Sequence, residues 1–156
     1  MIKPKIGELW GESLIAFEGY HHLISQLLTD YRPELVPWLE KVLFSRRDMP
    51  LALVIVEKLN TDEKQRLFSS LVQLASKTVP HTGTVRNIIS ALPRDWVLRH
   101  VEDVTADILN GADSEECRRI LELYSELDKG LLQNLCEQII ASGTADFQEV
   151  ARDFMD

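Results

Sequence analysis

Residues 51–76 have the sequence LALVIVEKLNTDEKQRLFSSLVQLAS, which is an apolar run, a polar turn and an amphipathic segment. The run at 51–56 is apolar nearly all round, and a buried β-strand is the alternative to a buried helix for such a run. We favour the helix, because the sequence offers no second strand-like segment to pair with it. Asn60 followed by Glu63 has the spacing of a capping box, which marks the start of another helix. This stretch therefore predicts two helices joined by a tight turn.

Similar turns recur about every 33 residues along the chain. They fall at residues 27–33, 58–62, 91–95 and 123–128. Helical hairpins with such a period stack into a solenoid, in which each unit buries its apolar face against its neighbours. We therefore predict a single all-α domain over residues 1–156, built as a right-handed α-solenoid of about four antiparallel hairpins with nine helices in all. The ninth helix, from Ala145 to about Met155, covers the last hairpin, and the breaker-rich segment 77–83 is a candidate joint.

The first predicted helix, at about residues 8–29, carries an unusually apolar face for a terminal unit. Large apolar or aromatic residues follow one another three or four positions apart, as one helix face requires. They are Trp10, Leu14, Phe17, Tyr20 or His21, Ile24 and Leu28. We expect Trp10 to pack in the core or between hairpins, but a terminal repeat without a polar outer surface is also prone to association. This motivates the hypothesis of a homodimer through the N-terminal helices, or of docking to a larger protein.

The repeated hairpins resemble the HEAT and armadillo class of α-helical repeats over residues 12–142. The resemblance rests on the hairpin length, the apolar stripe on each helix, the small turns with Asp or Pro, and Val85 followed by Arg86 near the start of the third unit. The family's Asp-x-x-Val-Arg start is only partly present, because Val85 lacks the preceding Asp and the other units lack Val-Arg. The resemblance implies a fold and a habit of binding proteins. Its relatives include alkylpurine DNA glycosylases and bilin lyases, so it does not exclude chemistry.

Charge is unevenly distributed along the chain. Residues 1–94 hold 12 Lys and Arg against 10 Asp and Glu, a net of +2, whereas residues 95–156 hold 5 against 15, a net of −10. The acidic half would repel a polyanion, which argues against nucleic-acid binding and favours a protein partner with a basic or apolar surface.

Two features are candidates for binding such a partner. The first is an acidic face, for which a merely solvated surface is the alternative. Its residues are Glu102, Asp103, Asp107, Glu115, Glu116, Glu122 and Glu126. The second is Trp38, which either projects from the end of the array as an interface anchor or packs in the core or between hairpins, and we favour the packed position.

No group of residues has the pattern of a catalytic, metal or cofactor site. His21 and His22 are adjacent on a helix and point about 100° apart, so they cannot share one ion, and we expect one to face inward and the other to face solvent. His100 three residues before Asp103 is either an oriented base or a surface ion pair, and we favour the ion pair. The glycosylase alternative needs Trp96 and Arg99 beside Asp103 in a basic groove, but these residues lie in the acidic half. We therefore predict a protein that is not an enzyme and has no cofactor.

Cys117 and Cys136 fall on two neighbouring predicted helices. Small buried thiols are the favoured interpretation, and a disulfide or redox pair is the alternative. The basic N-terminus has no apolar run behind it, so we expect neither a signal peptide nor a membrane span, and a cytoplasmic location. The predicted function is a non-enzymatic protein–protein interaction or scaffold module with an acidic binding face. The alternatives are a small regulatory or immunity-type binder that neutralises a basic protein, and a HEAT-like enzyme of the glycosylase or lyase type.

Overall fold

The structure is a computed structural model that describes residues 5–77 and 79–155. Within these residues the chain forms ten helices and no strand, so the all-α prediction is confirmed there. The helices are α1 (Ile6–Asp30), α2 (Arg32–Val42), α3 (Met49–Lys58), α4 (Thr61–Arg66), α5 (Phe68–Ser76), α6 (Thr82–Ser90), α7 (Arg94–Leu109), α8 (Ser114–Leu127), α9 (Lys129–Ser142) and α10 (Ala145–Asp153).

The predicted count of nine helices is wrong by one, because the helix expected to begin at Asn60 is divided. The backbone N–H of Leu67 donates to the carbonyl of Lys64 at 3.1 Å, a bond of a tight turn, as well as to that of Glu63 at 3.3 Å. This local tightening ends α4 and starts α5 with Leu67 fully buried. The expected capping box is present, since Asn60 Oδ1 accepts from the N–H of Glu63 and Glu63 Oε2 accepts from the N–H of Asn60, each at 2.9 Å.

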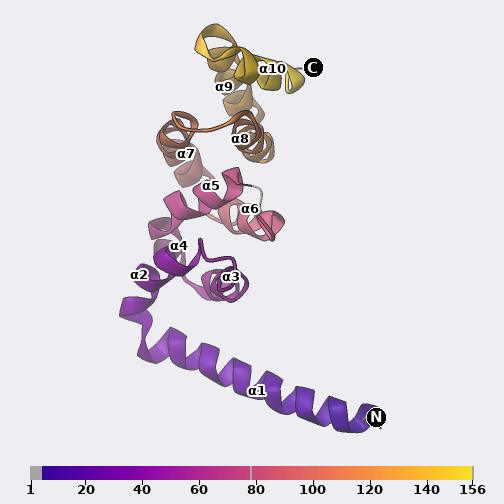
Figure 1. The fold of residues 1–156 in the computed structure, drawn as a ribbon. Coiled ribbons are helices and arrows are strands. Elements are labelled where there is room, and N and C mark those ends of the chain that lie inside the picture. Colours follow the sequence, from indigo (N-terminus) through magenta and orange to yellow (C-terminus); the bar gives the residue numbers. More distant parts are fainter. Residues whose placement is uncertain (1–4, 78, 156) are drawn as a thin grey trace.

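Helices α2 to α10 lie one above another in an elongated column, with the N- and C-terminal ends of the molecule far apart (Figure 1). On one side, α3 contacts α6, α6 contacts α8, and α8 contacts α10. Helix α5 contacts α7, α6 and α8 in the middle of the column. The predicted joint lies between α5 and α6, which pack against each other, and it includes Thr78, which is outside the described residues.

The core follows the column. The apolar run of α3 buries Ala52, Leu53, Ile55 and Val56, while Leu51 is exposed, so this helix is buried on most but not all of its circumference. A second, smaller cluster joins α8, α9 and α10 and contains both cysteines as buried free thiols, as predicted. None of the helices in the described part of the chain is long and apolar enough to cross a membrane.

The placement of helix α1 differs from what the sequence led us to expect. It projects from the end of the column instead of lying along it (Figure 1). Of its residues only Ile24 is buried, so the prediction that Trp10 packs in the core or between hairpins is wrong, and Leu14, Phe17 and Tyr20 are exposed as well. The physical reason is length: α1 has 25 residues and α2 has 11, so about 37 Å of helix meets a neighbour of about 16 Å.

Candidate interaction surface

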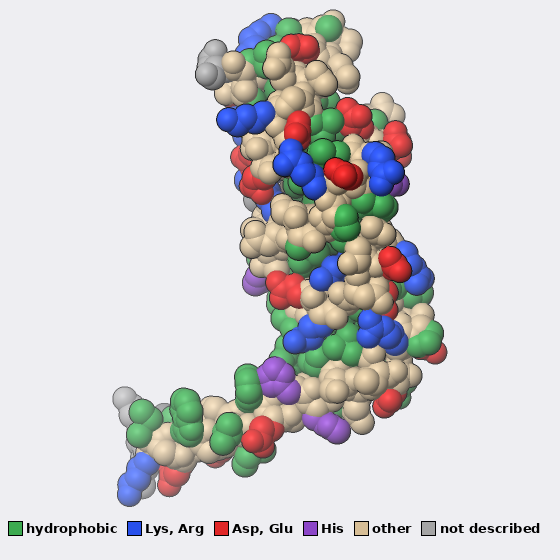
Figure 2. All heavy atoms as spheres, turned by 180° about the vertical axis from the view of Figure 1, so that it is seen from behind, with side chains coloured by type: hydrophobic (Ala, Val, Ile, Leu, Met, Phe, Trp, Pro, Cys, Tyr) green, Lys and Arg blue, Asp and Glu red, His purple; other side chains and the backbone are tan. Residues whose placement is uncertain are grey.

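The exposed apolar face of α1 is the most unusual surface of the molecule. Eight of its large apolar side chains are exposed: Ile6, Leu9, Trp10, Leu14, Ile15, Phe17, Tyr20 and Leu23. Trp10 is 73% exposed and Phe17 is 59% exposed. Figure 2 shows hydrophobic side chains along this projecting helix, away from the column. A contiguous apolar surface of this kind usually marks an interaction site.

Most of these side chains lie on one face, which we call the α1 stripe and define as Ile6, Leu9, Trp10, Leu14, Phe17 and Tyr20. Trp10, Phe17 and Ile24 are seven residues apart and share this face, so the stripe continues the face that Ile24 buries at the elbow between α1 and α2. The acidic residues Glu8, Glu12 and Glu18 fall on the remaining surface of the helix. The stripe itself therefore carries no charge.

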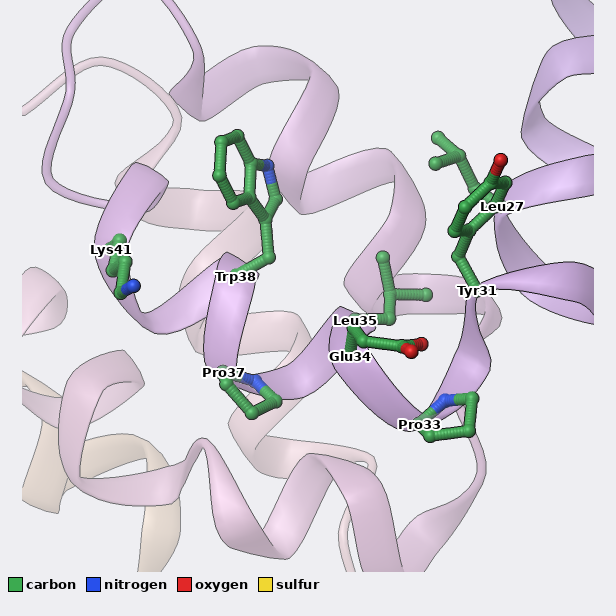
Figure 3. A pocket seen from close by; sticks show the side chains of 8 residues that line it. All are labelled: Leu27, Tyr31, Pro33, Glu34, Leu35, Pro37, Trp38 and Lys41. Atoms are coloured by element: carbon green, nitrogen blue, oxygen red, sulfur yellow. The ribbon is translucent and has the colours of Figure 1, made fainter.

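A hollow of about 510 Å³ lies at this elbow, where α1 meets α2 (Figure 3). Its lining consists of Leu27, Tyr31, Pro33, Glu34, Leu35, Pro37, Trp38 and Lys41. In Figure 3, Trp38 stands on one side of Leu35, and Tyr31 with Leu27 stands on the other. Most of the lining is apolar, with Glu34 and Lys41 as its only charged groups.

Trp38 is 61% exposed, so the favoured interpretation that it packs in the core or between hairpins is wrong. Its role in binding stays a prediction. Sequence reasoning missed Tyr31 and Leu27 as its neighbours, because they belong to the preceding helix and its end. The first predicted helix, at about residues 8–29, is long for one arm of a hairpin that repeats every 33 residues or so, and this length was a signal that it would overhang its neighbour.

The predicted acidic face is divided by the structure. Its α8 members form ion pairs with cations of α6, of the α5–α6 connection and of α8 itself. Arg86 donates to Glu122 at 2.6 Å and to Glu126 at 3.1 Å, and Lys77 donates to Glu116 at 3.1 Å. Glu115 lies 3.5 Å from Arg119 on the same helix. Figure 2 accordingly shows basic side chains beside acidic ones over the column.

These pairs alter the protonation of Glu122. Burial raises the pKa of its carboxyl group, but the hydrogen bond from Arg86 and the charges of Arg119 and Arg86 outweigh burial, so the pKa lies below the ordinary value. Glu122 is therefore ionised and neutralised within the protein. A carboxylate held in this way contributes little to the attraction of a basic partner.

The α7 members of the acidic face lie elsewhere. Asp103 and Asp107, one turn apart, line a shallow hollow of about 340 Å³ with Ser69 and Gln73 of α5. Glu102 lines a different hollow, beside Tyr124. These three carboxylates therefore line two different hollows, while those of α8 are ion-paired.

The candidate catalytic residues are also separated. His100 Nδ1 lies 2.7 Å from the carbonyl oxygen of Trp96, and the two rings stack with centroids 4.1 Å apart. The favoured ion pair with Asp103 is absent among the described residues. Arg99 donates to the carbonyl of Asp95 at 3.0 Å. In the part of the chain that the structure describes, no three His, Cys, Asp or Glu side chains are grouped as metal ligands.

The remaining polar candidates have local roles. His21 and His22 are both exposed, contrary to the expectation that one faces inward, and His21 packs its ring on Phe17 with centroids 4.2 Å apart. Burial, with a smaller contribution from nearby Cys136, raises the pKa of the Cys117 thiol to about 11. Burial likewise raises the pKa of Tyr124 to about 12, and its hydroxyl lies 2.6 Å from that of Thr105.

Comparison of the chain with protein-family models, with curated proteins and with solved structures gives no significant match. Function is therefore argued from the residues themselves.

Proposed function

We propose that this chain is a non-enzymatic protein-interaction module whose principal binding surface is the α1 stripe together with the elbow hollow. The observation that carries the proposal is the exposure of the stripe over the length of α1. Burying a large apolar side chain stabilises a complex by roughly 1.5–3 kcal/mol relative to leaving it in water. A partner that covers several of these side chains would therefore gain substantial binding energy.

The proposed scaffold for this surface is a right-handed α-solenoid of the HEAT-like kind, with about four hairpins and a terminal helix. Its support is the succession of contacts from α3 to α6, α8 and α10, in which each helix meets its neighbour along the column. This is the pattern that stacked repeats produce. The free thiols of Cys117 and Cys136 fit a reducing compartment, and a cytoplasmic location is part of the proposal.

The acidic face becomes a secondary element of the proposal. Only Glu102, Asp103 and Asp107 of the predicted set are exposed without an ion pair among the described residues, so steering of a basic partner would rest on α7. Steering of this kind changes association rates more than affinity. The apolar stripe would supply the affinity.

Photocrosslinking in the host cell tests the proposal. A photoreactive amino acid replaces Trp10 or Phe17 on the stripe, or, as the matched control, Ile15 on the opposite side of the same helix. Ile15 is 73% exposed, as Trp10 is, so accessibility does not distinguish the positions. We expect protein adducts of defined mass at Trp10 and Phe17 and none at Ile15. Adducts at no position, or equally at all three, would contradict the proposal.

A further inference from the structure

The unpaired length of α1 sets the requirements for whatever covers it. Residues 6–23 include no buried side chain, while Ile24 begins the contact with the column. The occupant must therefore present an uncharged apolar surface about 27 Å long, the rise of roughly 18 helical residues. Another α-helix of similar length has this shape.

The polar side of α1 disfavours a lipid surface. Helices that lie in a membrane interface carry Lys and Arg on their polar side, which attract anionic lipids. The segment Ile6–Asp30 has Glu8, Glu12, Glu18 and Asp30 but no Lys or Arg. An anionic bilayer would repel this helix at the depth where its stripe would have to insert.

The α1 helix of a second copy of the chain has a surface that is complementary to the stripe. In an antiparallel pair of helices with a seven-residue apolar repeat, the two kinds of core position face each other. Ser13 is the small residue between Trp10 and Phe17 on this face. Placing Phe17 opposite Ser13 of a second copy also places Trp10 opposite Tyr20 of that copy. The same register centres on residue 15, the middle of the segment 6–24, so the free lengths of both helices overlap completely.

The buried area is sufficient for a stable dimer. With full areas of roughly 150–250 Å² for the largest side chains, the exposed fractions of the stripe amount to roughly 700 Å² per chain. Two chains together would bury roughly 1,400 Å², within the range of roughly 1,200–2,000 Å² typical of specific interfaces. The antiparallel arrangement also sends the two columns, each part of a chain with net charge −8, to opposite ends of the pair.

We infer that α1 pairs antiparallel with α1 of a second copy of this chain, through the α1 stripe. The inference rests on the proposed function and names the partner for that surface. It goes beyond a general tendency to associate, because it specifies the face, the direction and the register of the contact.

The mass of the purified full chain in solution tests the pairing, measured by light scattering and sedimentation equilibrium at micromolar concentration. We expect twice the chain mass of 17.8 kDa for the wild type and for the control Ile15→Glu, and the single-chain mass for Trp10→Glu with Phe17→Glu. All three side chains are exposed, so the helical content and Tm of the single-chain form should change little. A wild type of single-chain mass, or a dimer that survives Trp10→Glu with Phe17→Glu, would overturn the inference.

The direction of the pairing is tested by measuring the distance between two spin labels, one on each chain of the variant Glu8→Cys. The native thiols are buried and stay unlabelled. In the inferred register the two labelled positions differ by 14 residues along the axis, or about 21 Å. A parallel pair, with helix axes about 10 Å apart, would place the two labelled positions at one level along the axis, and would overturn the antiparallel arrangement. A wild type of single-chain mass that still forms stripe-specific adducts with another protein in the cell would refute self-pairing and leave the proposed function standing.

Discussion

Replacing Glu63 by glutamine should weaken the ion pair that joins Arg32, at the elbow, to Glu63 of α4 in the column. Arg32 donates from Nε to Glu63 Oε1 and from Nη2 to Oε2, each at 2.7 Å. The Glu63 side chain is 12% exposed and that of Arg32 is 40% exposed, so the pair is partly shielded from water. Glutamine retains an oxygen for the capping bond but presents an amide N–H₂ to one arm of the guanidinium, where donor meets donor.

The expected loss in the free energy of unfolding lies between two limits. Fully exposed ion pairs contribute roughly 0.2–1 kcal/mol, and hydrogen bonds to charged groups contribute roughly 1.5–3 kcal/mol. Because Arg32 is substantially exposed, we place the loss for Glu63→Gln near the boundary, at about 1.5 kcal/mol. For a chain of this size such a loss lowers Tm by about 3–6 °C.

A double-mutant cycle isolates the pair. Urea unfolding of Glu63→Gln, Arg32→Met and the double variant should give a coupling energy of about 1 kcal/mol. The matched control is the single hydrogen bond between Arg118 and Asp153, whose carboxylate side chain is 53% exposed, so that the pair should couple negligibly. Equal coupling in the two cycles would refute the argument that shielding and the double contact strengthen the Arg32 pair.

The same pair predicts a pH dependence. Burial raises the pKa of Glu63, but hydrogen bonds from Arg32 and from the N–H of Asn60, with the charge of Arg32, outweigh it and set the pKa below the ordinary value of 4.5. A lowered pKa in the folded state gives stability that is fully present above the unfolded value and is lost as pH falls through the folded value. The stability difference between wild type and Glu63→Gln should therefore be full at neutral pH and shrink below about pH 4.5. A difference that is unchanged in acid would contradict this assignment.

Three further outcomes are expected. Tyr124→Phe should cost about 1 kcal/mol in urea unfolding, because the hydroxyl of Thr105 loses its 2.6 Å partner within the core. Asp113→Ala should cost about 1 kcal/mol in thermal unfolding, since Asp113 caps α8 by accepting from the N–H of Glu116 at 2.8 Å, whereas Asp113→Asn should retain most of the stability. The thiols of Cys117 and Cys136 should react with a thiol reagent only on unfolding, and fast labelling of the folded protein would contradict their burial.

The helix starts could be predicted because their determinants are local. Asn60 with Glu63 and Asp113 with Glu116 are three residues apart, and both capping boxes form as the spacing predicts. The inward faces of α5 and α8 likewise follow from the periodicity of their own residues. In each case the information lies within one or two helical turns.

Whether the α1 stripe packs against the column or faces solvent could not be predicted in the same way. Periodicity shows that Trp10, Leu14 and Phe17 share a face, and hydrophobicity shows that this face needs a partner. Neither property says whether the partner lies in the same chain. The structure answers this question, because Ile24 is the only buried residue of α1 and the stripe that precedes it is exposed.

The acidic half of the chain shows why a charge count along the sequence is an incomplete guide to a surface. Among the described residues, six ion pairs join residues that are far apart in sequence: Arg32 with Glu63, Lys77 with Glu116, Arg86 with Glu122, Arg86 with Glu126, Arg94 with Asp128 and Arg118 with Asp153. Their separations are 31, 39, 36, 40, 34 and 35 residues, close to the period found in the turns.

In every one of these six pairs the cation comes earlier in the chain than the carboxylate. Stacked units would place a residue beside its counterpart one period later, so the pairs support the proposed solenoid independently of the turns. A ladder with this polarity concentrates cations in the first part of a chain and carboxylates in the last part. The step from +2 to −10 between the halves therefore arises in part from contacts between successive units. For this reason the uncharged stripe of α1, which no internal contact explains, is the stronger evidence for a partner.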